Sequence, residues 1–259
     1  MDYFKKIETL TTDLTWNIPE QKQGRVNIIG GSLGNFRTEV RIAEYFSTNY
    51  PVEATSLVLP DALKSKLPGL PNFIFLPSTD SGSFAESQEF ATTIDAADYS
   101  LVLGDLSKNA ITGRALSSAL QTSEKPIVAT RDSVDLITDN SPERILMREN
   151  LILFASMAQL QKLFRAVYYP KMLLLSSSLI QVADALHKFT LSYPVRIITL
   201  HSGQILIAGD GNIRAIPIEK SGYPPITFWN GELASKITVL NLYNPNAFLD
   251  ATISAIFSS

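Results

Sequence analysis

The chain has 259 residues, of which 22 are Lys or Arg and 25 are Asp or Glu; its formal charge is −3, 45% of its residues are apolar, and it has no cysteine. This composition supports a buried core and excludes a disordered chain, a disulfide scaffold, a thiolate metal site and a cysteine nucleophile. The near-balanced charge argues against nucleic acid as a partner, and His187 and His201 are too few for a multi-histidine metal centre.

Residues 1–23 predict an amphipathic lead-in helix followed by a polar connector. The first residues mix charged and apolar side chains, so they lack the apolar core of a signal peptide. The longest apolar runs, at 151–161 and 172–183, are bounded by charges and fall short of the roughly 20 apolar residues that span a membrane. We therefore expect a cytoplasmic protein without a membrane partner.

Short apolar runs typical of buried strands recur along the chain, at residues 26–30, 54–59, 73–76, 100–104, 126–130, 151–154, 195–200 and 204–208. Segments of helical periodicity lie between several of them, at 38–47, 83–96, 110–122, 172–188 and 231–242. This alternation favours a doubly wound, mostly parallel α/β sheet. Gly209-Asp210-Gly211-Asn212 separates two apolar runs and predicts a hairpin, hence an antiparallel edge. With no linker or repeat, we expect one domain over residues 1–259.

A glycine-rich turn, Gly30-Gly31-Ser32-Leu33-Gly34, follows the first strand of the predicted sheet and precedes a helix. Glycines at this place let backbone amides approach a ligand, and the helix that follows favours an anion. Tight turns between a strand and a helix also need glycine for conformation alone. The turn is incomplete as a dinucleotide motif, so both interpretations stay open.

Four side chains near the ends of other predicted elements are candidates for chemistry. Glu232 lies in the first turn of a helix, where an acid is more often a helix-start residue than a general base. Asp132 and Asp135 follow a strand at the ligand-binding edge of an α/β sheet, yet they equally suit the start of a short helix. His201 ends a strand and either reaches a phosphate or only terminates the strand.

In chain order these pieces resemble the C-terminal domain of the YjeF type, the ADP- or ATP-dependent NAD(P)H-hydrate dehydratases of the ribokinase-like fold. Four stretches carry the resemblance over residues 20–259: the opening strand and turn from Gly24 to Phe36, the strand end Val102-Leu103-Gly104-Asp105-Leu106, Thr130-Arg131-Asp132-Ser133-Val134, and Trp229-Asn230-Gly231-Glu232-Leu233-Ala234. The resemblance implies a three-layer α/β/α sandwich with an antiparallel edge hairpin.

The resemblance also implies a site. Glu232 takes the place of the family's catalytic aspartate; ADP or ATP, which brings Mg²⁺ with it, lies near Thr227, Asn230, Gly231 and His201; and hydrated NAD(P)H lies near Gly31, Ser32 and Asp132. No metal site formed by the protein alone is implied.

Several family residues are replaced. Trp229 stands where the family has a glycine, His201 where it has a lysine, and residues 154–159 keep neither the histidine nor the acid of the family motif. Three functions therefore remain: a divergent dehydratase, a binding protein of this fold with impaired catalysis, or a small-molecule kinase of this fold. The family's habit implies a homo-oligomer, and the apolar segment 247–257 fits either the core or a subunit interface.

Overall fold

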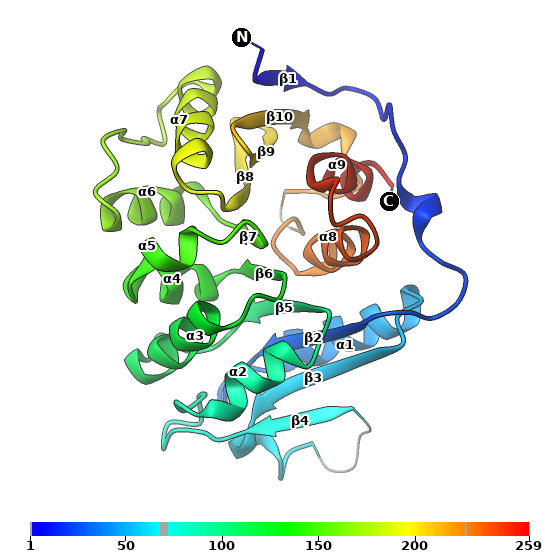
Figure 1. Ribbon diagram of the computed structural model, residues 1–259, viewed down its shortest axis with the longest axis vertical. Coiled ribbons are helices and arrows are strands. Elements are labelled where there is room, and N and C mark those ends of the chain that lie inside the picture. The colour runs from blue at the N-terminus through cyan, green and yellow to red at the C-terminus, as the bar shows by residue number, and fades with distance from the viewer. Residues whose placement is uncertain (1, 68–71, 226, 259) are drawn as a thin grey trace.

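The computed structural model describes residues 2–67, 72–225 and 227–258, and its ten strands form one sheet in the order β1-β10-β9-β8-β7-β6-β5-β2-β3-β4 (Figure 1). The strands are β1 (Phe4–Lys6), β2 (Arg25–Gly30), β3 (Ala54–Pro60), β4 (Phe73–Leu76), β5 (Tyr99–Gly104), β6 (Ile127–Thr130), β7 (Leu151–Phe154), β8 (Arg196–His201), β9 (Gln204–Gly209) and β10 (Asn212–Pro217). Strands β2 to β8 run parallel, so the predicted α/β sheet is confirmed.

Helices cover both faces of the sheet. One layer holds α1 (Arg37–Asn49), α8 (Glu232–Tyr243) and α9 (Phe248–Phe257). The other holds α2 (Gln88–Asp95), α3 (Ala110–Thr122), α4 (Asp132–Asp139), α5 (Pro142–Leu146), α6 (Met157–Ala166) and α7 (Leu179–Ser192). Short 3₁₀ turns lie at Thr15–Asn17, Asp61–Leu63 and Ile218–Lys220. The segment predicted for core or interface is α9, whose apolar side chains lie in the core.

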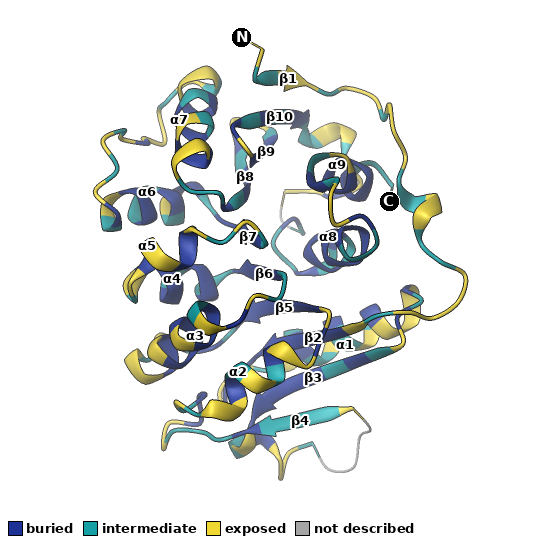
Figure 2. Cartoon of the chain, in the orientation of Figure 1, coloured by how far each residue is buried: buried dark blue, intermediate teal, exposed yellow. Residues whose placement is uncertain are grey.

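The central strands are buried on both faces, which explains their continuous apolar runs (Figure 2). Neighbouring residues of one strand pack on opposite faces of the sheet. Ile28 lies in the core between the sheet and the layer of α1 and α8, and Ile29 lies in the core between the sheet and the layer of α2, α3 and α4. The period of two in a strand therefore divides the apolar residues between two cores.

Two tight hairpins join β8, β9 and β10. The predicted one turns at Asp210 and Gly211, whose φ angles are 51° and 71°. The other turns at Ser202 and Gly203, with φ angles of 49° and 70°. Both turns therefore have the left-handed backbone that two-residue hairpins need. The first hairpin was predicted from its Asp-Gly signal, and the second lacks that signal.

The predicted lead-in helix over residues 1–23 is wrong. The segment instead contributes β1, which pairs parallel to β10 at the sheet edge, and a 3₁₀ turn at Thr15–Asn17. Its hydrogen bonds go to distant elements: the Leu14 amide donates to Ser254 Oγ at 3.0 Å, and Ser254 Oγ donates to the Thr12 carbonyl at 3.0 Å. These tertiary contacts replace the local bonds that a helix would make.

Two helix starts differ from the prediction for one shared reason. Helix α7 begins at Leu179 rather than near residue 172, because Ser178 and Gln181 form a capping box. Helix α6 was not predicted, and it begins with the same pattern at Ser156 and Gln159. In this motif the serine and the glutamine satisfy each other's backbone amides, so Ser-x-x-Gln marks the helix start.

The chain reverses its winding direction between β2 and β5. From β2 it passes outward to β3 and β4, and then returns to the other side of β2 to build β5, β6 and β7. Crossover connections at such a point diverge to opposite layers and leave a crevice at the carboxyl ends of the two strands. The ends of β2 and β5 are therefore the expected place for a ligand.

Candidate functional site

The glycine turn after β2 uses its backbone amides internally. The Gly31 amide donates to the Gly104 carbonyl at 2.9 Å, and the Ser32 amide donates to the Asn35 carbonyl at 2.7 Å. Gly31 has a φ of 81°, in the left-handed region that favours glycine. The conformational reason for this glycine is thus established, and contact of Gly31 and Ser32 with a substrate stays a prediction.

The ends of β5 and β6 hold a strained backbone and three charged side chains. The φ angles of Gly104, Asp105 and Arg131 are 111°, 53° and 56°. The Arg131 guanidinium donates to both carboxylate oxygens of Asp105, at 2.6 and 2.9 Å. Left-handed backbone at non-glycine residues costs free energy and gathers at functional sites. This pair of strand ends therefore has the marks of a ligand site.

Asp132 is the first residue of α4 and lies against these strand ends. Its Oδ2 accepts a hydrogen bond from the Leu106 amide at 3.1 Å, and its Oδ1 has no partner among the residues that the structure describes. Burial, followed by the nearby charge of Asp105, raises the pKa of the Asp132 carboxyl. Asp132 thus starts a helix, as one of its two interpretations predicted, and its contact with a substrate stays a prediction.

An open cleft of about 720 Å³ lies beside Asp132, between the ends of β6 and β7. Four cationic side chains line it, with Asp132 and Asp135 as the acids. The cations are Lys108, Arg131, Lys162 and Arg165. Lys162 lies 3.6 Å from Asp135 and 2.7 Å from Asp139. The excess of cations suits an anionic ligand such as a phosphate ester.

The start of α8 presents Glu232 beside this edge. Gly231 has a φ of 99°, and a Cβ there would lie 2.9 Å from Leu103, so glycine is required. The Asn230 side-chain oxygen accepts a hydrogen bond from the Glu232 amide at 2.9 Å. Asn230 thus satisfies the amide of the first residue of α8, across the left-handed Gly231 at which the helix starts.

Glu232 has a cationic partner from another helix. Arg41 of α1 donates to Glu232 Oε1 at 2.6 Å and to the Asn230 carbonyl at 2.9 Å. The Glu232 side chain is 30% exposed, so the ion pair is open to solvent. The pair orients the carboxylate and occupies one of its two oxygens.

Trp229 is part of an aromatic cluster at the wall of the cleft. Its ring meets Phe154 edge-on at 5.2 Å and Phe228 edge-on at 4.8 Å between ring centroids. Phe154 ends β7, and Phe228 is fully buried. The indole is thus held by the core, in the position where the resembled family has a small residue.

The other residues predicted to bind the nucleotide, His201 and Thr227, lie at the same edge, and each is bonded to a different part of the chain. His201 ends β8, is 6% exposed, and its Nε2 lies 2.7 Å from the Ser177 carbonyl oxygen. Thr227 Oγ1 donates to the Pro224 carbonyl at 3.1 Å. Both polar groups already have protein partners, so their contact with a nucleotide stays a prediction.

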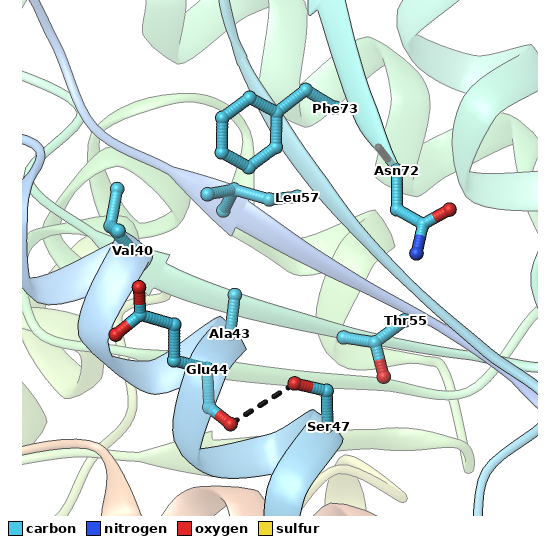
Figure 3. Close-up of a pocket in the computed structure, with 8 residues that line it drawn as sticks. All are labelled: Val40, Ala43, Glu44, Ser47, Thr55, Leu57, Asn72 and Phe73. Atoms are coloured by element: carbon cyan, nitrogen blue, oxygen red, sulfur yellow. Dashed lines mark hydrogen bonds between the residues drawn. The ribbon is translucent and has the colours of Figure 1, made fainter. Parts of the chain in front are cut away.

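A second hollow, of about 250 Å³, lies between α1 and the strands β3 and β4 (Figure 3). Val40, Leu57 and Phe73 supply much of its lining, and Ser47 Oγ donates to the Glu44 carbonyl at its rim at 3.0 Å. It reaches toward the amino ends of these strands, the edge opposite to the charged cleft. None of the described residues that line it carries a positive charge, in contrast to the charged cleft.

Sequence reasoning missed most of the cleft. Lys108, Lys162 and Arg165 of the cleft, and Arg41 beside Glu232, lie on helices or loops without any motif, so only the tertiary structure places them. Arg131 could be noticed in the sequence only because it directly precedes Asp132. Within the described ranges, no group of three or more His, Asp or Glu residues is placed to hold a metal ion, and no helix there is long and apolar enough to cross a membrane.

No family model and no curated protein sequence matches the chain. Solved structures match by fold. A hypothetical protein from Streptococcus mutans is 15% identical, with a TM-score of 0.63, over 97% of this chain and 83% of that chain. A UPF0031 family member from Bacillus subtilis is 16% identical, with a TM-score of 0.60, over 93% and 83%.

An ADP/ATP-dependent NAD(P)H-hydrate dehydratase from Bacillus subtilis, co-crystallised with ATP and Mg²⁺ and soaked with CoA, is 16% identical, with a TM-score of 0.59, over 92% of this chain and 80% of that chain. A pyridoxal kinase from the same organism, in complex with ADP, has a TM-score of 0.52 at 10% identity. The predicted ribokinase-like α/β/α sandwich is therefore confirmed, and the resemblance to the dehydratases holds at the level of fold.

Proposed function

We propose that this chain is a divergent ADP- or ATP-dependent NAD(P)H-hydrate dehydratase, in which Glu232 is the acid–base residue. One observation carries the proposal: Arg41 holds the Glu232 carboxylate at the start of α8, three residues after Trp229, which lines the cation-rich cleft at the edge where α/β sheets bind ligands. The fold that the chain shares with a dehydratase co-crystallised with ATP and Mg²⁺ supports it.

In this proposal the cleft holds the phosphates of the hydrated dinucleotide. Arg131, Lys162 and Arg165 supply positive charge, and Asp132 is available as an acceptor for a substrate hydroxyl. The nucleotide lies toward Asn230 and Gly231, at the positive end of α8. Mg²⁺ arrives with the nucleotide and neutralises part of its phosphate charge. The cation-rich lining fits this anionic pair.

Glu232 moves the proton in this arrangement. A general base must reach the hydroxyl that it deprotonates, and the longer glutamate side chain extends one methylene beyond the aspartate of the resembled family. Arg41 binds one carboxylate oxygen, which leaves the other to accept a proton. General acid–base catalysis contributes about 10²- to 10⁴-fold to a rate.

The test is recovery of NADPH from hydrated NADPH with ADP or ATP and Mg²⁺, followed by NADPH absorbance. Glu232→Gln should lower turnover at least about 100-fold and leave binding of the nucleotide within about twofold. Glu44→Gln, an exposed glutamate on α1, is the matched control and should behave as the wild type. Equal turnover by Glu232→Gln and wild type would remove Glu232 from the mechanism.

A second function, a binding protein of this fold with impaired catalysis, is favoured by the core-held Trp229 and by the ion pair on Glu232. It predicts that ADP or ATP raises the thermal unfolding midpoint while NADPH recovery is absent in both wild type and Arg41→Ala. A ligand at 100 times its dissociation constant stabilises by about 2.7 kcal/mol, which a melting curve resolves. Turnover by the wild type would exclude this alternative.

A third function, that of a small-molecule kinase, predicts that ATP is converted to ADP in the presence of an alcohol substrate.

A further inference from the structure

Glu39, on the first turn of α1, is a buried acid that the proposed reaction does not use. Its exposure is 0%, and neither carboxylate oxygen has a hydrogen-bond partner among the residues that the structure describes. An ionised carboxylate without a partner is very costly to bury. The side chain is therefore stable in the core as a neutral acid. As a carboxylate it would cost free energy, which interactions with the neighbouring groups would have to offset.

The position of Glu39 ties it to the ligand edge. A Cβ at Gly30 would lie 2.9 Å from Glu39 Cγ and 3.0 Å from its Oε1, so the side chain fills the space beside the end of β2. A Cβ at Gly104 would overlap Asp132 Oδ1. The two glycines at the switch point thus make room for two carboxyl groups, one from each layer.

The charged groups that face Glu39 come from the neighbouring strand ends. They are Asp105 after β5, and Arg131 and Asp132 after β6. Helix α8, which packs on α1, contributes Glu232, which is already paired with Arg41. Arg131 is bound on both sides of its guanidinium to Asp105, so Glu39 and Asp132 remain the unbalanced acids.

We propose that Glu39 is a positioning residue that sets the affinity of the cleft for phosphate-bearing ligands: as an uncharged group it keeps a further negative charge away from the strand ends that hold Arg131 and Asp132. Asp132 and Arg131 line the cleft, whereas Glu39 is fully buried and close enough to both for their charges to act on it. A neutral Glu39 adds no negative charge beside Arg131 at this side of the cleft. An ionised Glu39 adds one negative charge there and repels the ligand.

Burial, followed by the charge of Asp105, raises the pKa of Glu39 to about 8. The carboxyl is therefore neutral at pH 7 and ionised well above pH 8. A unit charge acting at several ångströms in a partly solvated site changes an affinity about fivefold to tenfold. This inference rests on the proposed function only in assigning a phosphate-bearing ligand to the cleft.

The experiment measures binding of NADPH by calorimetry between pH 7 and 9.5, where the charge of NADPH does not change. The wild type should bind about fivefold more weakly at pH 9.5 than at pH 7. Glu39→Gln should bind as the wild type does at pH 7 and keep that affinity at pH 9.5. Glu44→Gln, the exposed control on the same helix, should follow the wild-type profile.

Two further measurements keep the result independent of how well Glu39→Gln folds. Infrared spectroscopy of the wild type should show a protonated carboxyl band at pH 7 that disappears with the same midpoint as the affinity. Asp105→Asn removes a charge that faces Glu39, so it should move that midpoint to lower pH.

An equal loss of affinity in wild type and Glu39→Gln would overturn the role of Glu39 and leave the proposed function standing. An infrared band without any pH dependence of NADPH binding would do the same. Absence of NADPH binding by the wild type at pH 7 would instead remove the phosphate-bearing ligand from the cleft, and with it both proposals.

Discussion

Two glutamates on the same helical layer have opposite environments at the carboxyl edge of the sheet. Glu232 at the start of α8 is partly exposed and paired with Arg41, whereas Glu39 at the start of α1 is fully buried and unpaired. The comparison shows that the position of an acidic residue at a helix start does not by itself reveal the function of that residue. The cation within reach and the access of water decide whether the acid is ionised.

The buried member of the pair should make the protein less stable as the pH rises. A carboxyl with a pKa near 4.5 in the unfolded chain and about 8 in the folded chain binds more protons when folded between these values. The free energy of unfolding should therefore fall by about 1.4 kcal/mol per pH unit across this window, about 5 kcal/mol in all.

Urea denaturation at pH 5, 6.5 and 8 measures this effect. The difference in stability between Glu39→Gln and the wild type should grow steadily in favour of the variant as the pH rises. A constant difference at the three pH values would show that Glu39 ionises in the folded protein as it does in the unfolded one, and the contrast with Glu232 would collapse.

The next largest effect on stability is expected at Gly231, the residue before Glu232. In Gly231→Ala the new Cβ meets Leu103 and Ile42 and the backbone stays left-handed, so we expect a loss of about 2–4 kcal/mol. Gly203→Ala is the matched control, since Gly203 has a φ of 70° with nothing within 4 Å of its Cβ position, and it should lose only about 1 kcal/mol. Equal losses, measured by thermal unfolding, would mean that the backbone alone, and not packing against α1, fixes the start of α8.

The smallest effect on stability is expected when the ion pair between Arg41 and Glu232 is removed. Arg41→Ala should change the free energy of unfolding by less than about 1 kcal/mol, because the pair is exposed to solvent. Its effect on NADPH recovery should be larger, at least about tenfold, because the Glu232 carboxylate loses its orientation. A stability loss above about 2 kcal/mol in chemical denaturation would show that Arg41 is a structural residue.

The fold was predictable where apolar runs are long and regular. The strand at 151–154 and the helix at 110–122 have the predicted bounds, because burial on both faces and helical periodicity act within a few residues of chain. The helix at 83–96 shortens to α2, which begins at Gln88. The segment before β2 was mispredicted because its partners, such as Ser254, are far away in the sequence.

The candidate site was predictable at its strand ends and not at its helices. Asp132 and Gly231 stand next to recognisable strands or turns, so order along the chain places them. Arg41 and Glu39 look like ordinary surface residues of an amphipathic helix. Glu232, which pairs with Arg41, and Asp105, whose charge acts on Glu39, come near them only when the elements pack together, and local spacing does not contain that information.

The edge strand β1 has a consequence for how the chain acquires its structure. Its partner β10 and the Ser254 hydroxyl that holds Leu14 lie near the other end of the sequence, 240 residues away for the latter contact. During synthesis residues 4–14 leave the ribosome long before β10 and Ser254, against which they dock. The hydrogen bonds of Leu14 and Thr12 with Ser254 span 240 and 242 residues, so this segment should dock late and close a fold that has already formed around β2 and β5.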